Sequence, residues 1–382
     1  MKTLKKVLAM CLAVILVLSF AGCHQKNEVA VKAGDDTFTS AFYMCALINA
    51  DMAARTKIDE AKAAEKESTT SSATSSTTST ATDYFAEKID GKDYETYVKD
   101  AALQTLRRFT YVKRMCDENK LTISDQEKNN SFTMTEYYWN YYGYASLFEA
   151  NGVSLNTYKE YTLYGLYEEK YFNFIYGEGG DKAVSETDIK NFLYGNYAIA
   201  DILSASVASK TDSEKALVQT DFEKYKTRLE NGETFEKIYK EYNNIKEDTT
   251  TSTTSSAASS ATASTTSGSE ENKTLTPKDS YAQVVGNEET SYSSKQYETI
   301  KAMKTGEVKF VKDDENGYYY LFVKGDITTD PYYLENLKST VLNDMKFEEF
   351  DAAVKVETAK VELTTVAFAI NQFKVKKIKY PY

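Results

Sequence analysis

Residues 307–324 read EVKFVKDDENGYYYLFVK. The segments 307–311 and 318–324 are rich in β-branched and aromatic residues, and the pair Asn316-Gly317 between them is a strong signal for a hairpin turn. One further apolar strand and three segments with helical spacing surround this hairpin: residues 198–207, 212–231, 235–242 and 294–304. The stretch therefore predicts a small α+β unit in the second half of the chain.

The first half of the chain is predicted to be helical after a short strand at residues 28–32. Residues 124–127 read Ser-Asp-Gln-Glu, the form of a capping box, in which the serine and the glutamate satisfy backbone N–H groups at the start of a helix. The other helical segments of this half are residues 42–50, 94–119, 151–176 and 185–194. A last amphipathic helix begins at Pro331, beyond the α+β unit.

Two tracts of low complexity interrupt this pattern. Residues 68–82 contain only Ser, Thr and Ala, and residues 249–269 contain only Ser, Thr, Ala and Gly. Neither tract has apolar side chains large enough to offset the entropy of an ordered chain, so we expect both to be disordered. The second tract lies between two helices of the α+β unit, and we interpret it as an insertion within that unit.

The charge balance and the histidine count exclude several classes of function. The sequence has 46 Lys and Arg against 57 Asp and Glu, a formal net charge of −11, and a single histidine. Nucleic acid is not expected as a partner, because its phosphates require a basic face. A lone histidine excludes His-rich zinc sites and catalytic pairs of imidazoles, and we expect neither a metal nor a cofactor.

The amino terminus has the pattern of an export signal. Lys2, Lys5 and Lys6 precede the apolar residues 7–20, a stretch that is too short for a comfortable transmembrane helix. It ends in Phe-Ala-Gly-Cys at residues 20–23, which resembles a bacterial lipobox. We expect a signal peptide at residues 1–22, a lipid on Cys23 and an extracytoplasmic protein anchored to the cell membrane. An ordinary signal peptide is the alternative.

Cys45 and Cys116 are the two thiols outside the amino-terminal segment. Outside the cytoplasm they are able to form a disulfide, and the alternative is two buried thiols. The sequence leaves both interpretations open.

Tyrosines follow one face of the helix predicted at residues 151–176. Tyr158, Tyr161, Tyr164, Tyr167 and Tyr171 have the spacing 3, 3, 3, 4, which places them on one side of a helix. One interpretation is a seam between packed helices. The other is a cradle for apolar polypeptide, because a tyrosine ring combines a large apolar body with a polar tip that tolerates water. The first four tyrosines are therefore candidates for binding unfolded chains.

The order of these segments resembles the extracytoplasmic foldase lipoproteins of the PrsA type and their periplasmic relative SurA. The resemblance is carried in collinear order by residues 29–34, 42–43, 152–170, 184–190, 232–242, 303–308 and 317–323. It implies an α+β fold in which a helical chaperone domain is completed by a C-terminal helix and contains an inserted parvulin-like domain.

The resemblance also implies the domain boundaries. After the signal peptide we expect a SurA-like chaperone domain at residues 23–195 and a parvulin-like domain at 196–328. A helix and strand at 329–363 return to the chaperone domain, and a tail follows at 364–382.

Parvulins catalyse prolyl cis-trans isomerisation with two facing histidines and an apolar pocket for proline. At the positions that match the histidines this chain has Asp201 and Tyr319, and Tyr297 matches the aromatic residue of the pocket. The resemblance therefore implies a parvulin fold without its usual catalytic residues. Two interpretations of Asp201 stay open: an altered acid that works with Tyr319, or a solvated strand residue left after activity was lost.

These expectations combine into a membrane-anchored chaperone or foldase that binds unfolded or nascent secreted polypeptides, with weak or lost isomerase activity. Two alternatives are an active peptidyl-prolyl isomerase with an unconventional pocket and a non-catalytic, ligand-binding or adhesive surface lipoprotein. Clients, oligomeric state and the role of the tail do not follow from the sequence.

Overall fold

The computed structural model describes residues 28–69, 82–245, 276–286 and 294–381. The predicted signal peptide, Cys23, most of the first low-complexity tract and all of the second lie outside the described residues. The chain divides into two compact units. The first, which we call the helical unit, runs to Lys182 and resumes at Glu348; the second, the sheet unit, is Ala183–Phe347. None of the described helices has both the length and the hydropathy needed to cross a bilayer.

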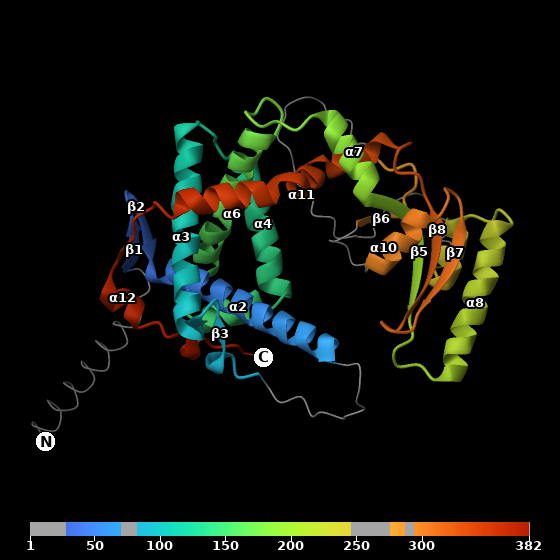
Figure 1. The fold of residues 1–382 in the computed structure, drawn as a ribbon, viewed down its shortest axis with the longest axis horizontal. Coiled ribbons are helices and arrows are strands. Elements are labelled where there is room, and N and C mark those ends of the chain that lie inside the picture. Colours follow the sequence, from blue (N-terminus) through green and yellow to red (C-terminus); the bar gives the residue numbers. More distant parts are fainter. Residues whose placement is uncertain (1–27, 70–81, 246–275, 287–293, 382) are drawn as a thin grey trace, which may run out of the picture. The chain divides into compact units, whose positions relative to one another are not determined.

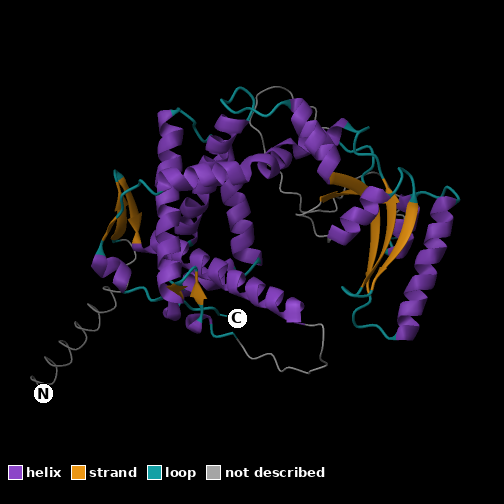
Figure 2. Ribbon diagram, viewed as in Figure 1, coloured by secondary structure: helices purple, strands orange, loops and turns teal. Residues whose placement is uncertain are grey.

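Helices make up most of the helical unit (Figures 1 and 2). They are α2 (Ser40–Thr69), α3 (Tyr94–Glu118), α4 (Asp125–Tyr141), α5 (Tyr144–Ala150), α6 (Leu155–Tyr176), the end of α11 (Pro331–Thr358) and α12 (Ala367–Asn371). Two small antiparallel sheets have the orders β2-β1-β9 and β3-β4. Their strands are β1 (Val29–Ala33), β2 (Asp36–Thr39), β3 (Lys88–Ile89), β4 (Lys92–Asp93) and β9 (Thr364–Thr365), and two single turns of 3-10 helix are η1 (Tyr84–Ala86) and η2 (Val375–Lys377).

Side-chain caps explain where several of these helices begin. The predicted capping box is present at α4, where the Ser124 hydroxyl accepts the N–H of Glu127 at 3.2 Å and the Glu127 carboxylate accepts the N–H of Ser124 at 2.8 Å. At α6 the cap is simpler: the Ser154 hydroxyl accepts the N–H of Thr157 at 3.3 Å. These helix starts are therefore set by local sequence.

Arg108 joins three helices of the helical unit. It lies on α3, donates two hydrogen bonds to Glu168 of α6 at 2.7 and 3.0 Å, and donates a third to Asp351 of α11 at 2.6 Å. A planar guanidinium matches carboxylates in this geometry. The contact with Asp351 shows how the end of α11 is held against the amino-terminal helices, as expected for a returning C-terminal helix.

The sheet unit is a four-stranded antiparallel sheet of order β6-β5-β8-β7. Its elements are α7 (Glu186–Asn196), β5 (Tyr197–Ser206), α8 (Asp212–Glu230), α9 (Phe235–Tyr242), β6 (Ala282–Gly286), α10 (Ser294–Ala302), β7 (Val308–Asp313), β8 (Tyr318–Lys324) and the beginning of α11. The hairpin predicted around Asn316-Gly317 joins β7 and β8. Gly317 has φ +70°, and a Cβ there would lie 2.6 Å from the Cβ of Ala208, so glycine is required for both reasons.

Two apolar layers cover the two faces of this sheet. On one face α10 packs against alternate residues of β5 and β8, including Ala200, Ile202 and Phe322. On the other face α8 and α9 pack against Leu203 and Leu321. The alternation follows from the two-residue period of a strand. The fold class is α+β, as predicted.

The units do not divide where the sequence analysis placed the domain boundaries. The helix α7, assigned there to residues 23–195, packs through Ile189 and Leu193 against Ile199 of β5 and Tyr333 of α11. The first part of α11 joins the same cluster. These apolar contacts group α7 and the start of α11 with the sheet, whereas the functional division into a chaperone and a parvulin-like domain stays a prediction.

Candidate functional site

The tyrosines predicted as client-binding candidates lie in the packing of the helical unit. The ring of Tyr164 stacks on Phe109 of α3 with centroids 4.5 Å apart and an angle of 8° between the planes. Tyr161 lies 5.5 Å from Phe42 of α2, measured between ring centroids. Burial raises the pKa of both phenols. Tyr161 and Tyr164 therefore lie in a seam between packed helices, which is the first of the two interpretations.

The ends of the same row differ in exposure. Tyr158 is buried, with its ring centroid 4.3 Å from that of Phe148 of α5. Tyr167 is half-buried beside Tyr164, and its backbone carbonyl accepts the thiol of Cys116 at 3.2 Å. Binding of polypeptide by these four tyrosines stays a prediction, and the row is already occupied by neighbouring helices over most of its length.

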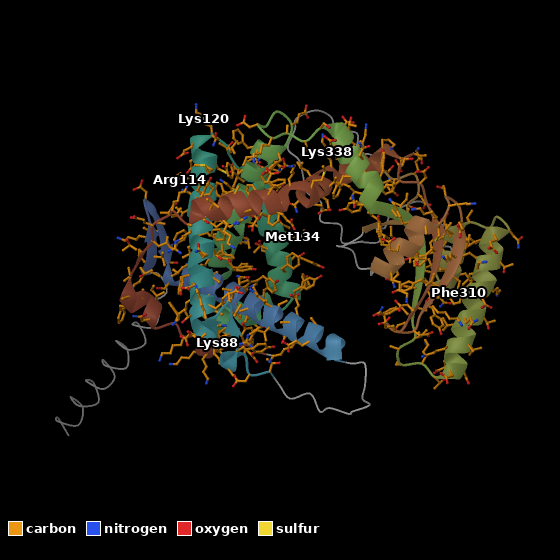
Figure 3. The ribbon with its side chains drawn as sticks, viewed as in Figure 1. Lys88, Arg114, Lys120, Met134, Phe310 and Lys338 are labelled. Carbon is orange, nitrogen blue, oxygen red and sulfur yellow. The ribbon has the colours of Figure 1, made fainter. Side chains whose placement is uncertain are left out.

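A second set of large apolar and aromatic residues, on α4 and just after it, is exposed. Met134, Tyr137, Tyr138, Tyr141 and Tyr142 expose 54, 48, 42, 75 and 58 % of their surface. The rings are close together: the centroids of Tyr137 and Tyr141 and those of Tyr138 and Tyr142 are each 5.1 Å apart. We call these five residues the α4 surface, and Figure 3 labels Met134 on this helix.

The buried side of α4 explains why the α4 surface points outward. Trp139 is 4 % exposed and packs on Phe148 and Tyr158, with ring centroids 6.1 and 5.6 Å away. The hydroxyl of Thr135 lies 3.0 Å from that of Thr162 on α6. These contacts turn the opposite side of the helix away from the unit. Sequence reasoning missed this surface, although the spacing of residues 134, 137, 138 and 141 is that of one helix stripe.

Asp201 is a buried carboxylic acid in the middle of the sheet unit. It lies on β5, is 6 % exposed, and its Oδ1 has no hydrogen-bond partner among the described residues. Burial, and secondarily the nearby carboxylate of Asp279, raises the pKa of Asp201 to about 7. The interpretation of Asp201 as a solvated strand residue is therefore wrong. The residue faces inward because Leu203, two positions along, belongs to the apolar layer under α8 and α9.

Tyr319 does not meet Asp201. In the pairing of β5 with β8, Asp201 lies opposite Val323 and Tyr319 lies opposite Ala205. Four positions along a strand correspond to about 13 Å. The hydroxyl of Tyr319 donates instead to Asp314 at 3.2 Å. The interpretation of Asp201 as an acid working directly with Tyr319 therefore has no support in the structure.

Tyr297 lies on the other face of the sheet. It belongs to α10, packs among Ile202 and Phe322, and donates its hydroxyl proton to the carbonyl of Gly195 at 3.1 Å. The three positions that match the parvulin site are thus all present in the sheet unit, but they do not converge on one pocket.

Cys45 and Cys116 are both buried, free thiols. The alternative of two buried thiols is therefore confirmed, and burial raises the pKa of Cys116 to about 11. Such thiols are poor nucleophiles. Among the described residues no group of three or more His, Cys, Asp or Glu side chains is arranged to hold a metal ion.

Comparison with solved structures finds several similar chains, two of which are PrsA structures. The chain is similar to PrsA from Bacillus subtilis with a TM-score of 0.33 and 20 % identity over 72 % of this chain and 89 % of that one. It is also similar to the foldase protein PrsA from Streptococcus pneumoniae with a TM-score of 0.37 and 11 % identity over 72 % of this chain and 88 % of that one. A scan of family models and a search of curated proteins found no match.

Proposed function

We propose that this protein is an extracytoplasmic chaperone, anchored to the membrane through Cys23, that assists the folding of secreted proteins, and that the isomerase activity of its sheet unit is weak or lost. The α4 surface carries the proposal. Soluble proteins rarely expose contiguous apolar clusters without using them to bind another molecule. The lipid anchor rests on the resemblance of residues 20–23 to a lipobox.

Tyrosine is suited to a surface that alternates between empty and occupied. Its hydroxyl stays hydrated when the surface is empty, and its ring supplies apolar area when a polypeptide binds. The rings of Tyr137, Tyr138, Tyr141 and Tyr142 lie 5.1 to 6.0 Å apart in the pairs that touch. An aromatic side chain of a bound polypeptide that packs on one of these rings contributes about 0.5 to 1.5 kcal/mol. Several such contacts hold an unfolded segment reversibly, as a chaperone requires.

The geometry of the sheet unit supports weak or absent isomerase activity. An isomerase lowers the barrier of a prolyl bond by binding the twisted amide better than the planar one. This requires groups that converge on one amide. Asp201 and Tyr319 are four positions apart along the sheet, and Tyr297 lies across it.

An aggregation assay tests the chaperone function. The chain from His24 onward keeps every described element, because the described residues begin at Glu28. We expect it to delay aggregation of a chemically unfolded reporter protein. Replacing Tyr137, Tyr141 and Tyr142 by Ser should weaken this effect about tenfold or more, since three ring contacts are lost.

The matched control replaces three exposed apolar residues elsewhere. Leu217, Tyr318 and Val356 are 66, 41 and 62 % exposed, and their replacement by Ser should leave the delay unchanged. Equal loss in both variants would show that general surface hydrophobicity, and not the α4 surface, holds the reporter.

A protease-free assay with a proline peptide tests the isomerase part. We expect a rate equal to the uncatalysed rate or only slightly above it. Turnover close to that of an active parvulin, abolished in Asp201→Ala, would establish the alternative of an active isomerase with an unconventional pocket. A chain that neither isomerises the peptide nor delays aggregation would favour the ligand-binding or adhesive lipoprotein.

A further inference from the structure

The C-terminal tail packs beside the first strand of the helical unit. Thr365 of β9 pairs with Val31 of β1, and the N–H of Val366 donates to the carbonyl of Ala30 at 2.9 Å. Figure 1 shows α12, which follows directly, beside β1. The tail therefore lies next to the point where the chain enters the fold.

This position is close to the proposed anchor. Cys23 precedes Val29 by six residues, which span at most about 20 Å when fully extended. A lipid on Cys23 would thus hold Val29, the first residue of β1, within about 20 Å of the membrane surface.

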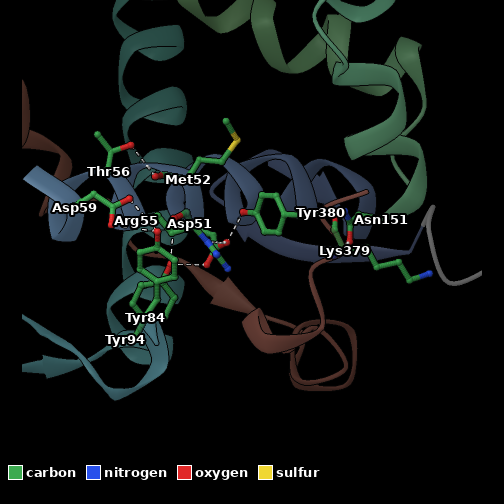
Figure 4. A network of polar contacts seen from close by, with 10 residues as sticks. All are labelled: Asp51, Met52, Arg55, Thr56, Asp59, Tyr84, Tyr94, Asn151, Lys379 and Tyr380. Atoms are coloured by element: carbon green, nitrogen blue, oxygen red, sulfur yellow. Dashed lines mark hydrogen bonds and ion pairs between the residues drawn. The ribbon is translucent and has the colours of Figure 1, made fainter. Parts of the chain in front are cut away.

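A network of polar contacts fixes the end of the tail to α2 and α5 (Figure 4). The hydroxyl of Tyr380 donates to the buried carboxylate of Asp51, and the guanidinium of Arg55 lies 4.6 Å above the Tyr380 ring. Asn151 exchanges two hydrogen bonds of 2.9 Å with the backbone of Lys379. Val375 is 1 % exposed between these points. The lysines of the tail are consequently presented by an ordered backbone.

Four exposed lysines are concentrated in this ordered segment. They are Lys374, Lys376, Lys377 and Lys379. Within the described part of the chain, no carboxylate forms an ion pair with any of them; the Nζ of Lys376 lies 5.7 Å from the ring centroid of Phe85. In a chain of net charge −11, this is a local excess of positive charge.

The tail also carries a cleft and an exposed aromatic ring. Lys374, Lys377 and Lys379 line a cleft of about 410 Å³, in which Glu149 is the one acid among the described lining residues. On α12 the side chain of Phe368 is 68 % exposed. Lysines that attract anionic headgroups and an aromatic ring that enters the interface are the two elements of peripheral membrane binding.

We propose that Phe368 and the four lysines together form a tail surface, which binds an anionic lipid bilayer and orients the helical unit on the membrane. The inference rests on the proposed anchor for its geometry, but not on the chaperone activity. The net negative charge of the whole chain does not oppose it, because charges more than about 10 Å from the surface are screened at physiological salt. The proposed ligand is thus a lipid bilayer: the lysines contact its anionic headgroups, and the ring of Phe368 inserts into its interface.

Vesicle binding tests the proposal without the anchor. The chain from His24 onward is sedimented with phosphatidylcholine vesicles that contain or lack phosphatidylglycerol. We expect binding at least about tenfold tighter when the anionic lipid is present, and weaker binding as salt is raised. Replacing the four lysines by Gln should reduce binding at least about tenfold, and Phe368→Ser should reduce it severalfold.

The control variant removes the same number of positive charges at other exposed positions. Lys120, Lys224, Lys309 and Lys355 are exposed and form no ion pair with described residues, so their replacement by Gln should leave vesicle binding unchanged. Equal loss in the control, or no preference for anionic vesicles, would overturn the proposal. Binding of soluble polyphosphate that depends on the lysines, with no effect of Phe368→Ser on vesicles, would also overturn it in favour of an anionic polymer.

The two proposals fail separately. The four-lysine variant should still delay aggregation of the unfolded reporter, and the variant with three serines on the α4 surface should still bind anionic vesicles.

Discussion

At the scale of single residues, Asp201 is the position where local sequence misleads most. A carboxylate on a strand is normally solvated, but here the side chain is 6 % exposed and its Oδ1 has no partner among the described residues. The nearby carboxylate of Asp279 contributes to the raised pKa of Asp201. Asp201 in turn contributes to the raised pKa of the buried Tyr333 hydroxyl. An acid in this position is held in its neutral form by burial.

This burial predicts a pH-dependent stability. The folded pKa of Asp201 is about 7, above the ordinary value of 3.8. Between these values the unfolded chain releases the proton and the folded chain keeps it, so stability is lost as the pH rises from about 4 to about 7. At pH 8 the whole loss of folding stability is present, and it amounts to about 4 kcal/mol.

Asp201→Asn should therefore raise the melting temperature of the sheet unit at pH 8 and change it little at pH 4. Thermal unfolding at the two pH values measures this. Asp326→Asn serves as a control, because Asp326 is hydrogen-bonded to the N–H and hydroxyl of Thr328 in a solvated loop and its pKa is lowered. A lower melting temperature for Asp201→Asn at pH 8 would contradict the prediction.

At the scale of elements, one buried carboxylate on α2 joins the end of the tail to two helices. Asp51 accepts hydrogen bonds from Arg55 at 2.9 Å, from the Tyr94 hydroxyl at 2.8 Å and from the Tyr380 hydroxyl. It thereby joins α2, the start of α3 and the last residues of the tail. Removal of this buried acceptor would leave three donors without a hydrogen-bond partner, which lowers the free energy of unfolding.

Asp51→Ala should destabilise the helical unit by about 3 kcal/mol or more, because the hydroxyls of Tyr94 and Tyr380 and the guanidinium of Arg55 lose their shared acceptor. It should also increase amide hydrogen exchange in η2 and the following residues. The control is Asp59→Ala, since Asp59 accepts only the exposed Tyr84 hydroxyl among the hydrogen bonds described for it. If hydrogen exchange of the tail did not change in Asp51→Ala, the network would not be what holds it.

At the scale of the whole molecule, the chain has two units with separate apolar cores. The core of the sheet unit is made by its own sheet and helices, and the helical unit is closed by chain from both ends of the sequence. Units with separate cores commonly unfold as separate cooperative transitions.

Calorimetry should therefore show two unfolding transitions. Asp201→Asn is expected to shift one of them and Asp51→Ala the other, because the two residues lie in different units. A single transition that moves with both substitutions would show that the units unfold together.

Much of the local structure was predictable because it depends on neighbours in sequence. The Asn316-Gly317 turn joins two strands, and the Ser124 capping box begins a helix, since both depend on hydrogen bonds within four residues. The opening strand and the helix that begins near Pro331 follow from apolar spacing in the same way.

Burial and exposure could not be read in this way, because they depend on residues that are distant in sequence. Tyr161 and Tyr137 lie in equally aromatic helices, yet Tyr161 is covered by Phe42 and Phe109 whereas Tyr137 is left open by the packing of Trp139. Asp201 is enclosed by side chains of other elements, and the tail is held by Asp51, which precedes it by more than 300 residues. Local hydrogen bonds and side-chain spacing thus define the elements, but long-range packing selects which of their faces meet water and which are available for function.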